Sequence, residues 1–176
     1  MRSFVLSVIG DDRPGLVSAL ADAIASHGGN WERSQLARLA GKFAGIVVVA
    51  VSTEDADALI GAVTSLDGLL EVAVHDATGA DDGAGDDWSA LTIGVLGNDR
   101  AGIIQEVSKV LGAAGITIDT MTAGTREAPM AGGLLFEAQL DVRVPPATDL
   151  LAVRSELEGL ASELFVDIDM SAAGDS

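Results

Sequence analysis

The stretch IGDDRPGLVSALADAIASHGGN, residues 9–30, has a counterpart later in the chain, LGNDRAGIIQEVSKVLGAAGIT, residues 96–117. Each stretch opens with a polar turn that contains Asp, Arg and Gly. Apolar residues then recur at i, i+1, i+4 and i+8, the spacing of one helix face. Gly28 and Gly115 stand just beyond the two segments, where a glycine that ends a helix is favoured. Two copies in register predict two sibling domains.

Both halves are expected to have the same order of elements. Alternating apolar residues and turn residues predict strands and helices in the order β-α-β-β-α-β, which is the ferredoxin-like order. In the first half the expected ranges are 2–9, 14–27, 30–39, 42–52, 54–66 and 69–76, with Ser52 or Thr53 as the cap of the second helix. In the second half they are 89–96, 101–114, 117–125, 132–144, 149–164 and 165–170. The predicted class is α+β, with antiparallel sheets that carry their helices on one face.

A boundary between the halves is visible in the composition. Residues 77–87 are rich in Asp, Gly and Ala and poor in large apolar side chains, which is typical of a linker. We therefore expect an N-terminal domain over 1–76, an acidic linker over 77–87, a C-terminal domain over 88–171 and a short tail over 172–176.

Charge and composition exclude several classes of function. The chain has 176 residues, a formal net charge of −17 and no cysteine. Binding to nucleic acids and to anionic membranes depends on clustered Lys and Arg side chains. DNA, RNA and anionic membranes are therefore poor partners for so acidic a chain. The absence of cysteine rules out disulfides and cysteine chemistry, and no apolar run is long enough to span a membrane. We expect a cytoplasmic protein without a cofactor or metal site, because His27 and His75 have no acidic partner at metal-ligand spacing.

The two predicted sheets differ on the side that the helices leave free. In residues 134–143 apolar and polar residues alternate, as in a strand with one wet face. In IVVVAV, residues 46–51, neither face is polar, so the strand needs cover on both sides. We expect another domain or chain to cover the first sheet.

The repeated turn has the chemistry of an amino-acid site. A helix start offers unpaired backbone N–H groups and a positive dipole, which suit a carboxylate. Pro14 fits the first helical turn, and Gly15 and Gly102 leave room for close approach. Asp12 and Asp99 can cap the helices, and Asp11 and Asn98 can face an ammonium group. The same residues are also common in plain turns and caps, so a purely structural role stays open.

Each half resembles an ACT domain, a small regulatory module of amino-acid metabolism. The resemblance rests on GDDRPG and GNDRAG, on the junctions SHGGNW and AAGITI, and on the predicted order of elements. The stretch DRPGLVSALADAIASHGGNWERSQLARLAGKFAGIVVV, residues 12–49, is similar in particular to the glycine cleavage system transcriptional repressor family, which consists of two ACT domains.

The resemblance implies that amino acids bind between paired ACT domains, at the turn after the first strand and at a polar residue that opens the second strand. The implied site residues are Gly10, Asp11, Asp12, Arg13, Pro14, Gly15 and Asn30 in the first half, and Gly97, Asn98, Asp99, Arg100, Gly102 and Thr117 in the second. Thr117 replaces the usual Asn and Ala101 the usual Pro, which weakens the second site.

The predicted function is a non-catalytic regulator that binds a small amino acid, with glycine and serine as candidates. It is expected to be a homodimer and to act on a protein partner such as a DNA-binding regulator. The alternative is an ACT interaction module that has lost its ligand. An RNA-binding sheet is disfavoured by the absence of tyrosine and by the acidic charge, and no part of the chain is left over for a catalytic domain.

Overall fold

The computed structural model describes residues 1–66, 68–79, 87–129 and 132–173. The chain divides into two compact units, Met1–Asp81 and Asp82–Ser176, and each is described by itself. The expected linker falls largely on residues outside the described ranges.

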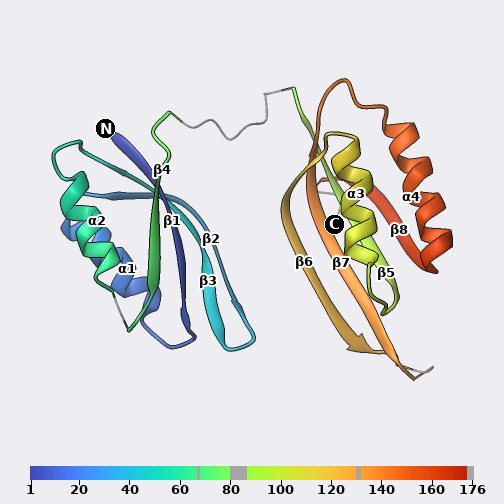
Figure 1. Cartoon of the computed structure of the whole chain (residues 1–176), viewed down its shortest axis with the longest axis horizontal. Helices are drawn as coiled ribbons and strands as arrows, with labels where there is room; N and C mark the ends of the chain where they lie inside the picture. Colours follow the sequence, from blue (N-terminus) through green and yellow to red (C-terminus); the bar gives the residue numbers. More distant parts are fainter. Residues whose placement is uncertain (67, 80–86, 130–131, 174–176) are drawn as a thin grey trace. The chain divides into compact units, whose positions relative to one another are not determined.

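The N-terminal unit has one four-stranded antiparallel sheet with the strand order β2-β3-β1-β4. Figure 1 shows both of its helices on one side of this sheet. The elements are β1 (Arg2–Asp11), α1 (Leu16–Ser26), β2 (Asn30–Leu39), β3 (Lys42–Val51), α2 (Ala56–Thr64) and β4 (Glu71–Asp76).

The C-terminal unit repeats the arrangement, with the strand order β6-β7-β5-β8. Its elements are β5 (Ser89–Asn98), α3 (Ile103–Ala113), β6 (Thr117–Glu127), β7 (Leu134–Val144), α4 (Leu150–Leu164) and β8 (Val166–Ala172). The prediction of two ferredoxin-like β-α-β-β-α-β domains in the α+β class is confirmed.

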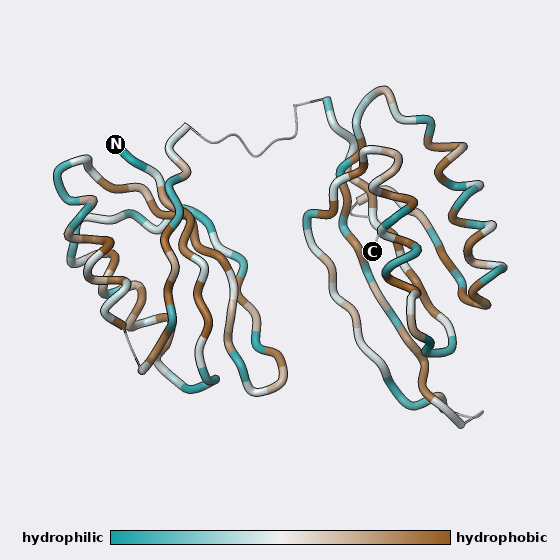
Figure 2. Tube along the Cα trace, viewed as in Figure 1, coloured by the Kyte–Doolittle hydropathy of each residue, from teal (hydrophilic) through white to brown (hydrophobic). Residues whose placement is uncertain are grey.

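Each unit has its own hydrophobic core between sheet and helices. In the first unit the inward side chains of β1 and β3 pack against the helices, and the buried members include Phe4, Leu6, Val47, Leu20 and Leu59. Burial of one such side chain contributes about 1.5–3 kcal/mol. In the second unit the corresponding buried residues include Ile93, Leu140, Val107 and Val153. The apolar segments of strands and helices can be followed in Figure 2.

Several boundaries differ from the sequence-based prediction, and those near the two turns matter most. β1 and β5 continue through Gly10–Asp11 and Gly97–Asn98, because these residues still pair with β3 and β7. Helices α1 and α3 begin at Leu16 and Ile103, after a glycine in the left-handed region. Helix α2 begins at Ala56 with Asp55 as its N-cap residue, so Ser52 and Thr53 are not caps; the Ser52 hydroxyl instead accepts a hydrogen bond from the Asp55 N–H at 3.1 Å.

The side of each sheet that lies away from the helices is called here its open face. Side chains alternate along a strand and residues paired across strands point the same way, so the register identifies the members. The N-terminal open face carries Ser3, Val5, Ser7, Ile9 and Asp11 of β1, Lys42, Ala44, Ile46, Val48 and Ala50 of β3, Asn30, Arg33, Gln35, Ala37 and Leu39 of β2, and Glu71, Ala73 and His75 of β4.

The C-terminal open face carries Thr92 and Leu96 of β5, Glu137, Gln139, Asp141 and Arg143 of β7, Thr117, Thr120, Thr122, Gly124 and Arg126 of β6, and Asp167 and Asp169 of β8. The predicted alternation of β7 is confirmed, since Ala138, Leu140 and Val142, which alternate with its polar residues, are buried.

Candidate functional site

The turn between β1 and α1 is short and ends in a glycine that the backbone requires. Gly15 is the N-cap residue of α1 and has φ 92°, a conformation that other residues rarely adopt. Gly15 has no side chain to cap α1, and no side-chain acceptor at the start of α1 is found among the described residues. The first backbone N–H groups of α1 therefore have no side-chain acceptor, the condition expected of a carboxylate site.

The prediction that Asp12 caps α1 is wrong. Its carboxylate instead forms an ion pair with Arg38 at 3.2 Å, and its backbone N–H donates to the Gly41 carbonyl at 2.9 Å. The chain leaves β1 toward the tip of the β2–β3 hairpin, so the carboxylate points to the hairpin and not to the helix. The N-cap position then belongs to Gly15.

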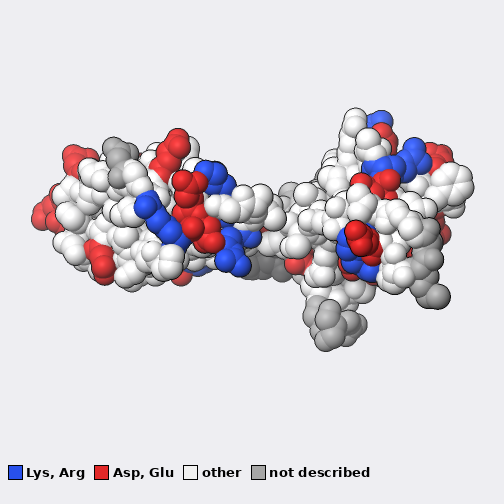
Figure 3. All heavy atoms as spheres, turned by 90° about the horizontal axis from the view of Figure 1, so that it is seen from below, with Lys and Arg blue, Asp and Glu red and all other residues white. Residues whose placement is uncertain are grey.

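Asp11 is also held by the hairpin. Its carboxylate forms an ion pair with the Lys42 ammonium, and the hydrogen bond from Lys42, followed by its charge, holds the pKa of Asp11 below its usual range. Figure 3 shows acidic and basic side chains side by side on the N-terminal unit. The ammonium group that Asp11 faces here is the one of Lys42.

A hollow of about 220 Å³ lies on the β4 side of this turn. Its charged lining residues are Asp11, Arg13, Lys42 and Glu71. Arg13 donates a hydrogen bond to the Gly68 carbonyl and so ties the turn to the loop between α2 and β4. The predicted residues Asp11 and Arg13 thus line one hollow, together with Lys42 and Glu71, which the sequence analysis did not select.

Gly10 and Gly97 are explained by packing. A Cβ on Gly10 would lie 2.4 Å from the Leu69 carbonyl oxygen, and a Cβ on Gly97 would lie 2.5 Å from Cγ1 of Val166. Real Cβ atoms do not approach so closely. At both positions the neighbouring β4 or β8 segment excludes a side chain.

The turn between β5 and α3 has the same backbone conformation as the first turn, and its side chains make fewer contacts. Gly102 is the N-cap residue of α3 with φ 96° and no side-chain cap, so the prediction that Asp99 caps α3 is wrong as well. The Asp99 N–H donates to the Leu134 carbonyl at 2.8 Å. Asn98, Asp99 and Arg100 are exposed, and no side-chain partner is described for them within the residues that the structure covers. Leu135 takes the register position that Lys42 has in the first unit.

The residues that open the second strands lie far from the turns within their own domains. Asn30 pairs with Ala50, which pairs with Ser3, whereas Asp11 is at the other end of β1. At about 3.3 Å per residue the separation along the strand is about 26 Å. Thr117 and Asn98 are likewise at opposite ends of the second sheet, since Thr117 pairs with Arg143 and Arg143 with Ala90.

Thr117 has polar neighbours that the sequence analysis missed. Across the strand, Arg143 forms an ion pair with Asp119 at 2.7 Å between Nε and Oδ2. This ion pair could not be found from the alternation of residues in the sequence, because β6 is irregular between Ile118 and Thr120.

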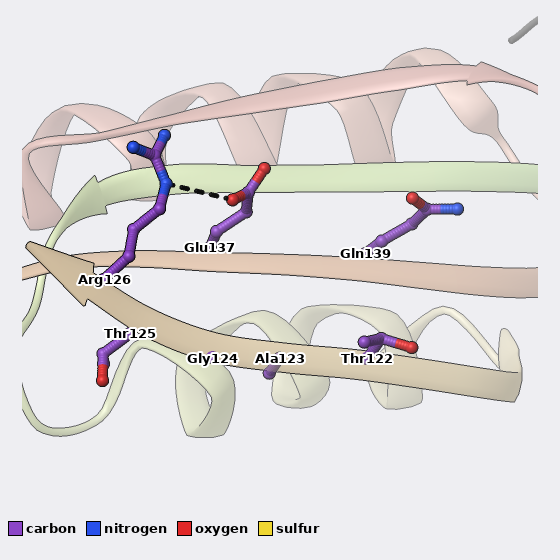
Figure 4. Close-up of a pocket in the computed structure, with 7 residues that line it drawn as sticks. All are labelled: Thr122, Ala123, Gly124, Thr125, Arg126, Glu137 and Gln139. Carbon is purple, nitrogen blue, oxygen red and sulfur yellow. Dashed lines mark hydrogen bonds and ion pairs between the residues drawn. The ribbon is translucent and has the colours of Figure 1, made fainter. Parts of the chain in front are cut away.

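A larger hollow of about 430 Å³ lies along β6 and β7. Arg126 and Glu137 form an ion pair in it, with 3.4 Å between Nε and Oε2. Figure 4 shows Arg126, Glu137 and Gln139 pointing the same way from the two strands, while Thr125 points the other way. Farther along the C-terminal open face, the hydroxyls of Thr92 and Thr120 donate to Asp141 at 2.9 and 2.8 Å.

No group of three or more His, Cys, Asp or Glu side chains that could hold a metal ion occurs among the described residues. In the same part of the chain, the search for membrane-spanning helices finds none of sufficient length and hydropathy.

Comparisons with known proteins agree with this geometry. The model of the ACT domain family matches residues 2–75. A crystal structure of an unknown protein from Galdieria sulphuraria is 31% identical, covers 98% of both chains and superposes with a TM-score of 0.85. The chain belongs to the ACT domain family.

A second solved structure extends the likeness of fold to the whole ACT tandem. It is that of a protein assigned as a glycine cleavage system transcriptional repressor, with 16% identity, a TM-score of 0.73 and coverage of 97% of this chain and 96% of that one. No curated protein matches the sequence significantly. The resemblance to tandem ACT proteins is thereby confirmed at the level of fold.

Proposed function

We propose that this tandem ACT protein is a non-catalytic, cytoplasmic regulator that binds a small amino acid, with glycine and serine as candidates. The observation that carries the proposal is the repeated helix start. In both domains a glycine in the left-handed region replaces the side-chain cap and leaves the first N–H groups of α1 and α3 without a side-chain acceptor. By contrast, Asp149 caps α4 through the N–H groups of Leu151 and Ala152.

The proposed site joins two ACT domains. A carboxylate would bind the helix start of one domain, and Asn30 or Thr117 at the start of the second strand of another domain would bind the amine or side chain. This division follows from the register, which separates the two parts by about 26 Å within a domain. The chain would act as a homodimer and pass the ligand signal to a protein partner, such as a transcriptional regulator of amino-acid metabolism, without binding nucleic acid itself.

One observation favours the alternative, a ligand-free interaction module. Both acidic side chains of the first turn already have cationic partners, Asp11 with Lys42 and Asp12 with Arg38. An amino acid would have to compete with these cations for them. In the second turn Asn98 carries no charge, and Thr117 is shorter than the asparagine of the family pattern.

The test is a thermal-shift screen of the full chain against the twenty amino acids at millimolar concentration, followed by calorimetry on any that bind. A ligand that binds the native state alone raises the melting temperature, by mass action. We expect a shift with one or two small amino acids and its loss in Asn30→Ala, with Thr117→Ala as the matched change in the second domain. Absence of a shift with every amino acid would support the interaction module.

A further inference from the structure

The β3 part of the N-terminal open face is apolar where a solvent-exposed strand would be polar. Ile46 at its centre is 47% exposed and Ile9 is 46% exposed. On this face Ile9 pairs with Ala44, Ser7 with Ile46 and Val5 with Val48. The fold does not require this composition. The register matches Ala44, Ile46, Val48 and Ala50 of β3 with Glu137, Gln139, Asp141 and Arg143 of β7, where the C-terminal open face is polar.

The charge on this face is balanced, unlike that of the chain. Across it the register places two acidic side chains, Asp11 and Glu71, and two basic ones, Arg33 and Lys42. The face is thus formally neutral on a chain of charge −17. Two copies of so acidic a protein repel each other over most of their surface, and repulsion is weakest where neutral faces meet.

The area is sufficient for a dimer. β1, β2 and β3 are 10 residues long and β4 is 6 residues long. At about 3.3 Å per residue and about 4.8 Å between strands, these four strands offer roughly 570 Å² on one face. Two copies face to face would bury about 1,100 Å² in total, above the roughly 1,000 Å² that a specific interface needs.

We infer that the N-terminal open face is a self-association surface whose occupant is the same face of a second copy of this chain. A two-fold contact uses the same surface on both subunits, so this surface must be complementary to itself. An apolar patch without net charge fulfils this condition. The C-terminal open face cannot serve in its place, because Glu137, Asp141 and Arg143 would lose water against Ile46 and Val48. The inference rests on the dimer of the proposed function and names the surface that forms it.

Sedimentation equilibrium of the full chain at micromolar concentration tests the inference. We expect a dimer for the unchanged protein and a monomer for Ile46→Arg, with a dissociation constant at least about 100-fold higher, since two arginines would face each other across the two-fold axis. Gln139→Arg, the matched position on the C-terminal open face, should leave the dimer intact. Far-ultraviolet circular dichroism checks that each variant is folded.

Crosslinking keeps the test decisive if Ile46→Arg fails to fold. The chain has no cysteine, so Ile46→Cys and Gln139→Cys each supply one reporter thiol. A short bis-maleimide should join two copies of Ile46→Cys and not two copies of Gln139→Cys. A monomeric unchanged protein would overturn both the dimer and its surface. A dimer that persists in Ile46→Arg, or no crosslink in Ile46→Cys, would overturn the surface alone, and calorimetry with the amino acid reports separately on ligand binding.

Discussion

The two ACT domains share their backbone and differ on their open faces. β3 presents Ala44, Ile46 and Val48 where β7 presents Glu137, Gln139 and Asp141, in the same register with the first strand of each domain. The buried sides of these strands are equally apolar in both domains. The fold therefore constrains one side of the sheet and leaves the other free to specialise, here for association in one domain and for polar interactions in the other.

The largest effect on stability is expected at Gly10 and Gly97, which hold equivalent positions in the two domains. Gly10→Ala and Gly97→Ala should each destabilise the protein by about 1–3 kcal/mol, because the added Cβ forces neighbouring segments apart. Gly61→Ala in α2, where a Cβ meets no atom within 4 Å, should instead stabilise it by about 0.5–1 kcal/mol. Urea unfolding of the full chain measures all three.

Gly10→Ala and Gly97→Ala form a matched pair at equivalent positions. If only one of them destabilises the protein, the two first strands are not packed alike, and the equivalence of the domains fails at this point.

Most of the fold could be predicted from the sequence. The repeat gave the domain pair, and strict alternation in β7 gave its buried side. The starts of α1 and α3 could not be predicted, because Asp12 and Asp99 are good capping residues by type and only the direction of the chain toward the hairpin decides against them. The partners of Asp11 and Asp12 were missed because Lys42 and Arg38 are distant in sequence and meet the turn only through strand pairing.

The position of Asn30 could have been deduced. In the predicted β-α-β order the helix returns the chain to the starting end of the first strand, so the start of the second strand lies at the end away from the turn. The resemblance to ACT domains places Asn30 and the turn in one site, and topology separates them within one domain.

A smaller effect is expected from Asp141, which makes the C-terminal open face different from the N-terminal one. Hydrogen bonds from Thr120 and then Thr92 lower the pKa of Asp141 below 3.8. The stability that they supply is present above pH 3.8 and is lost as the pH falls through the lowered pKa. Asp141→Asn should therefore melt below the unchanged protein at pH 7 and approach it as the pH falls through the lowered pKa of Asp141.

Asp167→Asn, on the same open face, is the control for Asp141→Asn. No hydrogen bond to the Asp167 carboxylate is described in the residues that the structure covers. A melting-temperature difference between Asp141→Asn and the unchanged protein that is as large at strongly acid pH as at pH 7 would show that the hydroxyl contacts do not depend on the carboxylate charge.

The smallest effect on stability is expected from Lys42→Leu, which gives the first turn the residue type that Leu135 supplies at the second. Removal of the ammonium should raise the pKa of Asp11 toward 3.8, since Lys42 is the main cause of its lowering. Stability should change little, because exposed ion pairs contribute little. Carboxyl-carbon NMR titration measures the pKa, and Arg38→Leu, which removes the partner of Asp12, should leave Asp11 unchanged. An Asp11 pKa that stays low in Lys42→Leu would mean that the charge of Arg13, and not Lys42, lowers it. Because the second turn has Arg100 at the matching position, the two turns would then not differ in this electrostatic effect.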